Sequence, residues 1–177
     1  MNLHRCVALF AVAAFVLFSN GMALLWGAAP QPTSAAPLPS DSIYQLALPL
    51  TDQRGKRQTF GDARGQVQIV AMFYATCGYV CPLTIETLKR IEAELSAVER
   101  ARLGVLLVTL DPQHDSVAAL KQLADSRETD PARWTLARTD GPADVRKLAA
   151  LLGVQYRQLA NGEFNHSTLL TLLDSEG

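Results

Sequence analysis

The chain has 177 residues, with 16 basic and 17 acidic side chains and a net charge of −1. One domain is the expectation for this length, and the near-neutral balance gives no support for a nucleic-acid-binding surface, which needs clustered Lys and Arg. Apolar residues make up 49% of the chain and charged residues 19%, which argues against a disordered protein.

The first 29 residues have the pattern of a targeting segment. A short basic start at residues 1–5 is followed by an unbroken apolar run at residues 6–18. That 13-residue run has the length of a signal peptide, while residues 6–26 reach the length of a membrane helix. A cleaved signal peptide and a retained N-terminal membrane anchor therefore both stay open. Either one predicts that the rest of the chain is exported to the periplasmic side of the inner membrane.

Residues 30–41 have the composition of a proline-rich linker, and the pattern changes from residue 42 onward. Beyond the linker, β-branched runs alternate with apolar residues at three- or four-residue steps, which predicts an α/β fold with a mixed central sheet over residues 42–177. Strands are expected at residues 43–50, 67–75, 104–110 and 133–138. Helices are expected from Pro82 to Val98, from Ser116 onward and at residues 142–152, before a hairpin that pairs residues 154–159 with residues 167–173.

The last four residues predict a turn. Residues 174–177 have turn composition, but no strand pattern follows them. We therefore expect that the domain is truncated at its C-terminal end and lacks its last strand and helix. Residues 167–173 would then form a strand with an uncovered edge.

Two of the three cysteines lie where a buried strand meets a helix. Cys77 and Cys81 are four residues apart, and residues at this spacing share one face at the start of a helix. The helix N-terminus favours the thiolate form of nearby cysteines. Such a pair can close a disulfide or bind a soft metal ion. A purely structural disulfide is the weaker interpretation, because a bridge over three residues constrains the unfolded chain little.

His166 is the candidate third ligand and decides between a redox centre and a metal site. It precedes the last apolar run, and strand and helix ends meet at one edge of an α/β sheet. Two thiolates and one imidazole suit copper in both of its oxidation states. Structural zinc sites usually take four protein ligands, and the sequence offers no evident fourth one.

The residues around these candidates have structural interpretations. Asp111 precedes a proline and predicts a turn, while Asp115 with Ser116 predicts the beginning of a helix. His114 lies in the same turn and is a weak candidate for a copper contact. Tyr74 ends the buried strand at residues 67–75 and is interpreted as a core residue.

Together these motifs resemble the Sco/SenC family of copper-binding, thioredoxin-like proteins. The resemblance lies in Phe73-Tyr74-x-x-Cys77-x-x-x-Cys81-Pro82, then Leu110-Asp111-Pro112-x-x-Asp115, and then Asn165-His166-Ser167. It extends from Leu46 to Gly177 and departs from the family pattern at Gly78, Tyr79 and Asn165, where members often carry Pro, Asp and Asp. The resemblance implies a thioredoxin-type fold with Cys77, Cys81 and His166 as ligands of a copper ion.

The resemblance also implies a function in the assembly of cytochrome oxidase. That function is delivery of copper to the copper-A centre, or maintenance of its thiols. The implied partners are the copper-bearing oxidase subunit and either a copper donor protein or a thiol reductase. The alternative is an exported thiol–disulfide oxidoreductase with Cys77 and Cys81 as its redox pair and His166 tuning thiolate reactivity. Whether the chain is an enzyme stays open, with a copper chaperone without turnover as the first expectation.

Overall fold

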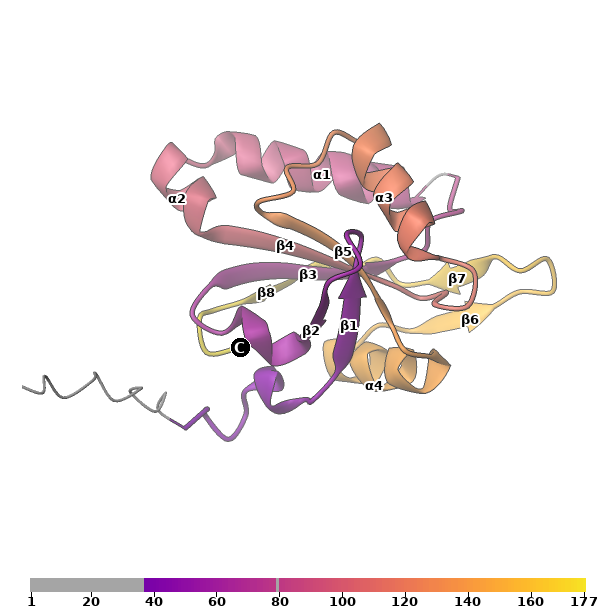
Figure 1. The fold of residues 1–177 in the computed structure, drawn as a ribbon, viewed down its shortest axis with the longest axis horizontal. Helices are drawn as coiled ribbons and strands as arrows, with labels where there is room; N and C mark the ends of the chain where they lie inside the picture. Colours follow the sequence, from indigo (N-terminus) through magenta and orange to yellow (C-terminus); the bar gives the residue numbers. More distant parts are fainter. Residues whose placement is uncertain (1–36, 79) are drawn as a thin grey trace, which may run out of the picture. The chain divides into compact units, whose positions relative to one another are not determined.

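A central sheet with helices on both faces organises the chain (Figure 1). The computed structural model describes residues 37–78 and 80–177, and these belong to one unit, Pro37–Gly177. The predicted targeting segment at residues 1–29 and most of the linker lie outside the described residues. Within the described part, no helix has the length and apolar character needed to cross a membrane.

The secondary structure alternates along the chain as the sequence predicts. The helices are α1 (Val80–Glu94), α2 (Ala97–Arg102), α3 (Val117–Ser126) and α4 (Pro142–Leu152), with short 3₁₀ helices η1 (Ile43–Gln45) and η2 (Phe60–Ala63). The strands are β1 (Pro49–Asp52), β2 (Arg57–Thr59), β3 (Val67–Phe73), β4 (Leu103–Thr109), β5 (Trp134–Thr139), β6 (Tyr156–Gln158), β7 (Phe164–His166) and β8 (Thr171–Leu173).

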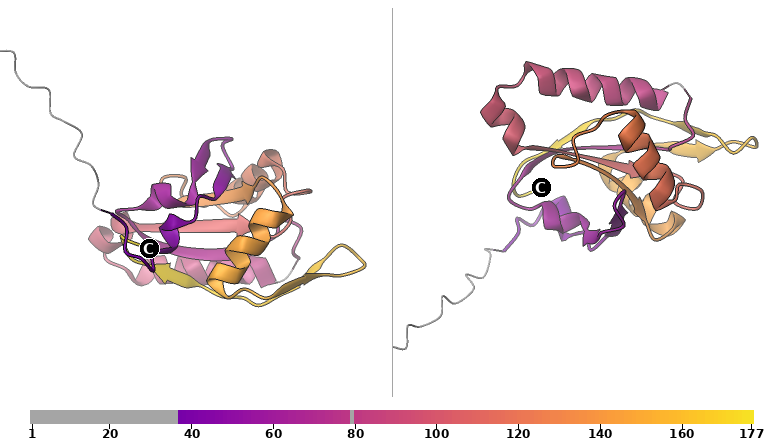
Figure 2. Two further views of the ribbon diagram at one scale, coloured as in Figure 1. Left: turned by 90° about the horizontal axis from the view of Figure 1, so that it is seen from below. Right: turned by 45° about the horizontal axis from the view of Figure 1, so that its top comes forward.

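Six strands form one mixed sheet, in the order β2-β1-β5-β4-β3-β8. The three central strands β3, β4 and β5 are parallel, while β1, β2 and β8 pair antiparallel with their neighbours. Helices α1 and α3 cover one face, and α4 with η1 and η2 covers the other (Figure 2). The predicted α/β fold with a mixed central sheet is therefore confirmed.

The central strands are apolar on both faces because both faces are covered. In β3, Ile69, Ala71 and Phe73 pack in the cluster under α1 and α3. Val70 and Met72 point the other way, into the cluster under α4. Successive side chains of a strand point to opposite faces, so a strand buried on both sides shows an unbroken apolar run.

The first predicted strand, at residues 43–50, is wrong over most of its length. Residues Ile43–Gln45 form η1, and the Ser42 side chain caps it by accepting a hydrogen bond from the Tyr44 N–H at 3.2 Å. The strand begins only at Pro49. A serine cap with apolar residues after it favours a helical turn, and the alternation at residues 43–50 conceals this signal.

The predicted hairpin is also wrong in its second arm. Strand β6 pairs with β7, so the hairpin closes on residues Phe164–His166. The run at residues 167–173 does not pair with β6, because Leu173 is buried in the core under α4 and β8 pairs with β3. Strand β8 lies at the end of the six-stranded sheet. That a further strand and helix belong after residue 177 stays a prediction.

Capping residues explain where several of the helices begin or end. The predicted helix from Pro82 to Val98 is wrong at its end, since α1 ends at Glu94 and Ser96 caps the separate helix α2. Val98 therefore lies on the surface, 65% exposed. The predicted cap at Ser116 is confirmed, and so is the stop at Gly153, which adopts φ +71° after α4.

Candidate functional site

The two cysteines come together at the junction of β3 and α1. We call residues 74–78, which follow β3, the cysteine loop. The Cys77 N–H donates to the Tyr74 carbonyl at 3.2 Å, which turns the chain back toward the helix. The Cys81 N–H, in the first turn of α1, donates to Cys77 Sγ at 3.3 Å. The first turn of a helix has N–H groups without partners inside the helix, and here one of them points at the sulfur.

The two sulfurs have different surroundings. Cys81 is 3% exposed and packs with the core under α1, whereas Cys77 is half-buried. Burial, followed by a hydrogen bond with Cys77, raises the pKa of the Cys81 thiol to about 12. Both cysteines are thiols, without a disulfide between them. The pair thus consists of one accessible sulfur and one buried sulfur that holds its proton.

Asp115 anchors the cysteine loop from the neighbouring strand end. Its carboxylate accepts hydrogen bonds from the Ala75 N–H at 2.9 Å and from the Thr109 hydroxyl. Asp115 is buried, and burial raises the pKa of this carboxyl despite those two bonds. The sequence interpretation as a helix start was incomplete: Ser116 is the cap of α3, while Asp115 reaches back to the loop.

Tyr74 connects the cysteine loop to the β6–β7 hairpin. Its backbone carbonyl accepts the hydrogen bond from the Cys77 N–H. Its ring packs against the Phe164 ring with centroids 5.3 Å apart, and against the His166 ring, nearly edge-on, at 6.1 Å. Burial, followed by the neighbouring Cys77 side chain, raises the pKa of the Tyr74 phenol. The side chain is buried, as predicted.

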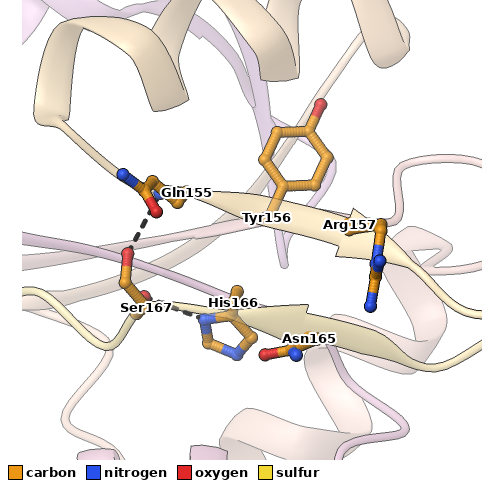
Figure 3. A pocket seen from close by; sticks show the side chains of 6 residues that line it. All are labelled: Gln155, Tyr156, Arg157, Asn165, His166 and Ser167. Atoms are coloured by element: carbon orange, nitrogen blue, oxygen red, sulfur yellow. Dashed lines mark hydrogen bonds between the residues drawn. The ribbon is translucent and has the colours of Figure 1, made fainter.

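His166 ends β7 and borders a hollow of about 420 Å³ (Figure 3). Its Nδ1 lies 3.1 Å from the Ser167 carbonyl oxygen. A carbonyl only accepts, so Nδ1 carries the proton and Nε2 of the neutral ring keeps its lone pair. Metal-binding histidines commonly use one ring nitrogen in this way and bind the metal with the other. The chemistry of His166 therefore fits a metal ligand.

His114 is held by its own turn. Its Nδ1 lies 2.8 Å from the Asp111 carboxylate, and its side chain is exposed. This ring nitrogen is thereby occupied, and the interpretation of Asp111 as a turn residue agrees with the contact.

The described residues contain no group of three or more His, Cys, Asp or Glu that could hold a metal ion as it stands. The structure brings Cys77 and Cys81 together and places His166 on the adjacent hairpin, with Tyr74 contacting both. The proposed ligand set of Cys77, Cys81 and His166 therefore stays a prediction.

The sequence predicts only structural parts for Tyr74, in the core, and for Asp115, at a helix start, and does not connect either residue with the cysteines. The signal that could have pointed to Tyr74 is a polar-tipped aromatic residue at the end of an apolar run, three residues before a cysteine. For Asp115 the signal is an acidic residue that follows a buried strand in a parallel sheet, where strand ends meet.

A dithiol at a strand–helix junction, on a mixed sheet covered by helices, defines a thioredoxin-like domain. The SCO1/SenC family model matches residues 40–177, and the chain belongs to this family. A protein of Stutzerimonas stutzeri to which copper binding is ascribed is 24% identical over 134 residues, or 73% of this chain. The matched part spans 64% of that relative's own length.

Solved structures of the family share the fold. A SCO1/SenC family lipoprotein from Bacillus anthracis is 22% identical with a TM-score of 0.66, covering 75% of this chain and 82% of that one. Bradyrhizobium japonicum ScoI, solved with copper bound, is 24% identical with a TM-score of 0.62, covering 73% and 82%. BsSco, a cytochrome c oxidase assembly protein of the Sco family with a disulfide switch, is 16% identical with a TM-score of 0.62, covering 72% and 74%.

Proposed function

We propose that this chain is a copper-binding metallochaperone, or a thiol maintenance factor, for assembly of the copper-A centre of cytochrome oxidase. The observation that supports it best is the donor set at one edge of the sheet. Two sulfurs adjoin at the start of α1, and the nearby His166 has its Nδ1 committed to a carbonyl and its Nε2 available. Copper-bound relatives with the same fold support the same assignment.

The donor chemistry favours copper over zinc. Thiolate sulfur stabilises the cuprous ion, and imidazole nitrogen accommodates the cupric ion. Copper is the cargo here, and the part of the protein is to hold it and release it. Cys77, which is half-buried, is the ligand that a partner can reach first, while Cys81 lies in the core.

A thiol–disulfide oxidoreductase is the second candidate, and the unequal burial of the two sulfurs favours it. The Cys77 thiolate would attack a client disulfide and form a mixed disulfide, with one client sulfur leaving as thiolate. The Cys81 sulfur, after losing its proton, would then close a Cys77–Cys81 disulfide and release the second client thiolate. A thiol reductase would have to return two electrons before the next cycle.

We further propose where the protein acts and with which partners. The domain would lie on the periplasmic side of the inner membrane, anchored or released by its first 29 residues. The copper-bearing subunit of cytochrome oxidase would be the client, and a copper donor protein or a thiol reductase the second partner. The lipoprotein relative from Bacillus anthracis supports a location at a membrane surface.

Copper titration of the full, reduced chain in mild detergent tests the proposal. We expect one retained copper per chain and a thiolate-to-copper absorption in the cupric state. His166→Ala should lose the cupric species and keep part of the cuprous binding, since two thiolates can still hold cuprous copper. Cys77→Ser and Cys81→Ser should lose both.

His114→Ala is the matched control, because this histidine is exposed and its Nδ1 is paired with Asp111. It should bind copper like the parent chain. A parent chain that retains no copper after desalting would end the chaperone proposal and favour the oxidoreductase. Loss of copper in the His114 variant would shift the ligand set away from His166.

A further inference from the structure

The ladder between β3 and β4 stops where the cysteine loop begins. Just past the end of β4, the Leu110 N–H donates to the Phe73 carbonyl at 2.6 Å. At this parallel register, the next rung would pair the Ala75 N–H with the Leu110 carbonyl and the N–H of residue 112 with the Ala75 carbonyl. Residue 112 is a proline without an N–H, so half of that rung is missing. The Ala75 N–H therefore donates to another acceptor, outside the ladder.

Asp115 supplies this acceptor. Its Oδ2 accepts hydrogen bonds from the Ala75 N–H at 2.9 Å and from the Thr109 hydroxyl. The Thr109 hydroxyl accepts the Asp111 N–H at 2.9 Å, so its single proton is directed to Asp115. Thr109 and Asp115 are both buried. A buried carboxylate is unfavourable unless it is hydrogen-bonded, so these two donors fix its position.

The bond to Asp115 lies two residues before Cys77. Two further hydrogen bonds of this segment are local: the Cys77 N–H donates to the Tyr74 carbonyl, and the Cys81 N–H donates to Cys77 Sγ. The bond between Ala75 and Asp115 instead joins residues 40 positions apart and ties the loop to the segment between β4 and α3. The position of the Cys77 sulfur at the start of α1 therefore depends on a contact from another part of the sheet.

We propose that Asp115 is a positioning residue: its carboxylate holds the cysteine loop, so that the Cys77 sulfur stays beside Cys81 at the start of α1. The inference deepens the proposed function and rests on it for its copper readout. Its thiol readout does not depend on copper, because the bond from Ala75 to Asp115 is present in the metal-free chain.

Two substitutions of Asp115 test this inference, because Asp115→Ala removes the acceptor and Asp115→Asn keeps one. Both donors meet the same oxygen, Oδ2, so a single amide oxygen can accept both. Asp115 also borders a hollow of about 290 Å³ together with Ala75 and Thr76, which leaves room for the amide NH2. A loss in Asp115→Ala that Asp115→Asn restores therefore identifies the hydrogen bond as the cause.

The first readout is the equilibrium of the full chain, in mild detergent, with reduced and oxidised glutathione. Oxidised glutathione takes two electrons from the Cys77 and Cys81 thiols, which form one disulfide, and it leaves as two glutathione thiols. A loop held in place keeps the two sulfurs close. We therefore expect the equilibrium constant for this disulfide to fall about 3- to 10-fold in Asp115→Ala, the effect of one net hydrogen bond, and to stay within about 2-fold in Asp115→Asn.

The second readout is the exchange of the Ala75 amide with solvent. In the reduced, metal-free chain we expect it to be about 3- to 10-fold faster in Asp115→Ala and close to the parent rate in Asp115→Asn. With copper bound, we expect the ion to dissociate about 3- to 10-fold faster from Asp115→Ala than from the parent chain.

Asp62→Ala is the matched control. Asp62 accepts the same two kinds of donor, the Thr59 N–H and the Thr59 hydroxyl, at 2.8 Å each. It lies in η2, which covers the opposite face of the sheet from α1 (Figure 2). This variant should leave the glutathione equilibrium and the copper dissociation unchanged.

Thr109→Val is the second variant, for the case that Asp115→Ala does not fold. It keeps the shape of the side chain and removes one of the two donors that hold the carboxylate. The glutathione equilibrium should shift in the same direction, by about 2- to 5-fold.

The outcomes separate the two proposals. An unchanged glutathione equilibrium in folded Asp115→Ala, or in Thr109→Val in its place, would overturn the inference, and so would an equal shift in Asp62→Ala. A shift in Asp115→Asn as large as in Asp115→Ala, with the Ala75 amide still protected, would also overturn it, because the charge and not the hydrogen bond would then act. If the parent chain retains no copper, the proposed function fails, while a shifted equilibrium in Asp115→Ala still supports the positioning.

Discussion

Cys77 and Cys81 have different surroundings because the core ends between them. The helix that begins at Val80 carries Cys81 into the cluster with Ile85 and Leu88, where the thiolate is poorly solvated. Cys77 stays at the rim, with a helix N–H pointing at its sulfur. In either proposed function, the outer sulfur meets the partner and the inner one completes the transfer.

Thiol alkylation measures this difference. In the folded, reduced chain at about pH 8, we expect iodoacetamide to modify Cys77 at least about tenfold faster than Cys81, because only thiolates react and burial keeps Cys81 protonated. Peptide mass spectrometry gives the two rates. In denaturant the rates should become equal. Equal rates in the folded chain would contradict the assigned roles.

Asp52 shows how a buried charge stabilises a turn. Its side chain is fully buried, and Oδ1 accepts from the backbone N–H groups of Arg54 and Lys56 at 2.8 Å each. Oδ2 accepts from the Arg54 guanidinium at 2.9 Å. Burial alone would raise the pKa of this carboxyl, but the hydrogen bonds from Lys56 and Arg54 outweigh it, and the pKa is lowered.

Asp52→Asn should destabilise the fold by about 1–3 kcal/mol near neutral pH. The amide oxygen can keep the two backbone donors, but the amide NH2 then replaces Oδ2 and faces the Arg54 guanidinium, donor against donor. A carboxyl with a lowered folded pKa contributes stability above its unfolded pKa of about 3.9, and loses it as the pH falls through the folded pKa. The difference in the free energy of unfolding between the parent chain and the variant should therefore become smaller at acidic pH. Denaturant unfolding at several pH values measures it.

Asp140→Asn is the control for this prediction, because Asp140 pairs with Arg57 on the surface. We expect this substitution to change the free energy of unfolding by less than about 0.5 kcal/mol at every pH. A pH-independent difference for Asp52→Asn would contradict the assignment of its charge to stability.

At the scale of the elements, β8 is an edge strand with one buried and one exposed leucine. Leu173 lies in the core under α4, while Leu172 is 68% exposed and borders an apolar hollow of about 370 Å³. Val67 of β3 and Leu95 after α1 line the same hollow. An edge strand with exposed apolar side chains can pair with another chain.

Leu172→Lys should therefore reduce self-association of the chain while changing the free energy of unfolding by less than about 0.5 kcal/mol. Leu173→Ala, on the other face of the same strand, should lower the free energy of unfolding by about 2–4 kcal/mol, because it removes core packing. Light scattering and denaturant unfolding distinguish the two effects. If Leu172→Lys self-associates as strongly as the parent chain, β8 is not the strand through which the chains associate.

At the scale of the whole molecule, we expect separate tasks for the folded unit and for the predicted targeting segment at residues 1–29. The unit Pro37–Gly177 contains both core clusters and the candidate site. The apolar run at residues 6–18 has no counterpart in it. We therefore predict that export depends on the first 29 residues and that folding depends on the rest.

Protease accessibility in spheroplasts tests this division. The full chain should be digested by protease added outside, and the chain without residues 1–29 should be protected inside the cell. Carbonate extraction then separates a retained anchor, which stays with the membrane, from a cleaved signal peptide, which leaves a released domain. A full chain protected like the shortened one would contradict export.

Local patterns in the sequence determined the central strands, the Ser116 cap, the Gly153 stop and the adjacency of the cysteines. Each of these depends on side-chain periodicity or on hydrogen bonds within a few residues, which the sequence displays directly. The pairing of strands that are far apart in the sequence could not be predicted from such local patterns. Residues 167–173 have an apolar run that fits a hairpin arm equally well, and only the competition for a place beside β3 decided its pairing.

The candidate site shows the same difference between local and long-range contacts. The sequence predicted that Cys77 and Cys81 lie together, because they are four residues apart at the start of a helix. The anchor from Asp115 to Ala75 joins residues 40 positions apart, and the contact of Tyr74 with His166 joins two separate elements. No local pattern encodes such contacts, because they depend on how strand ends and a hairpin meet at one edge of the sheet. Only the tertiary structure decided them.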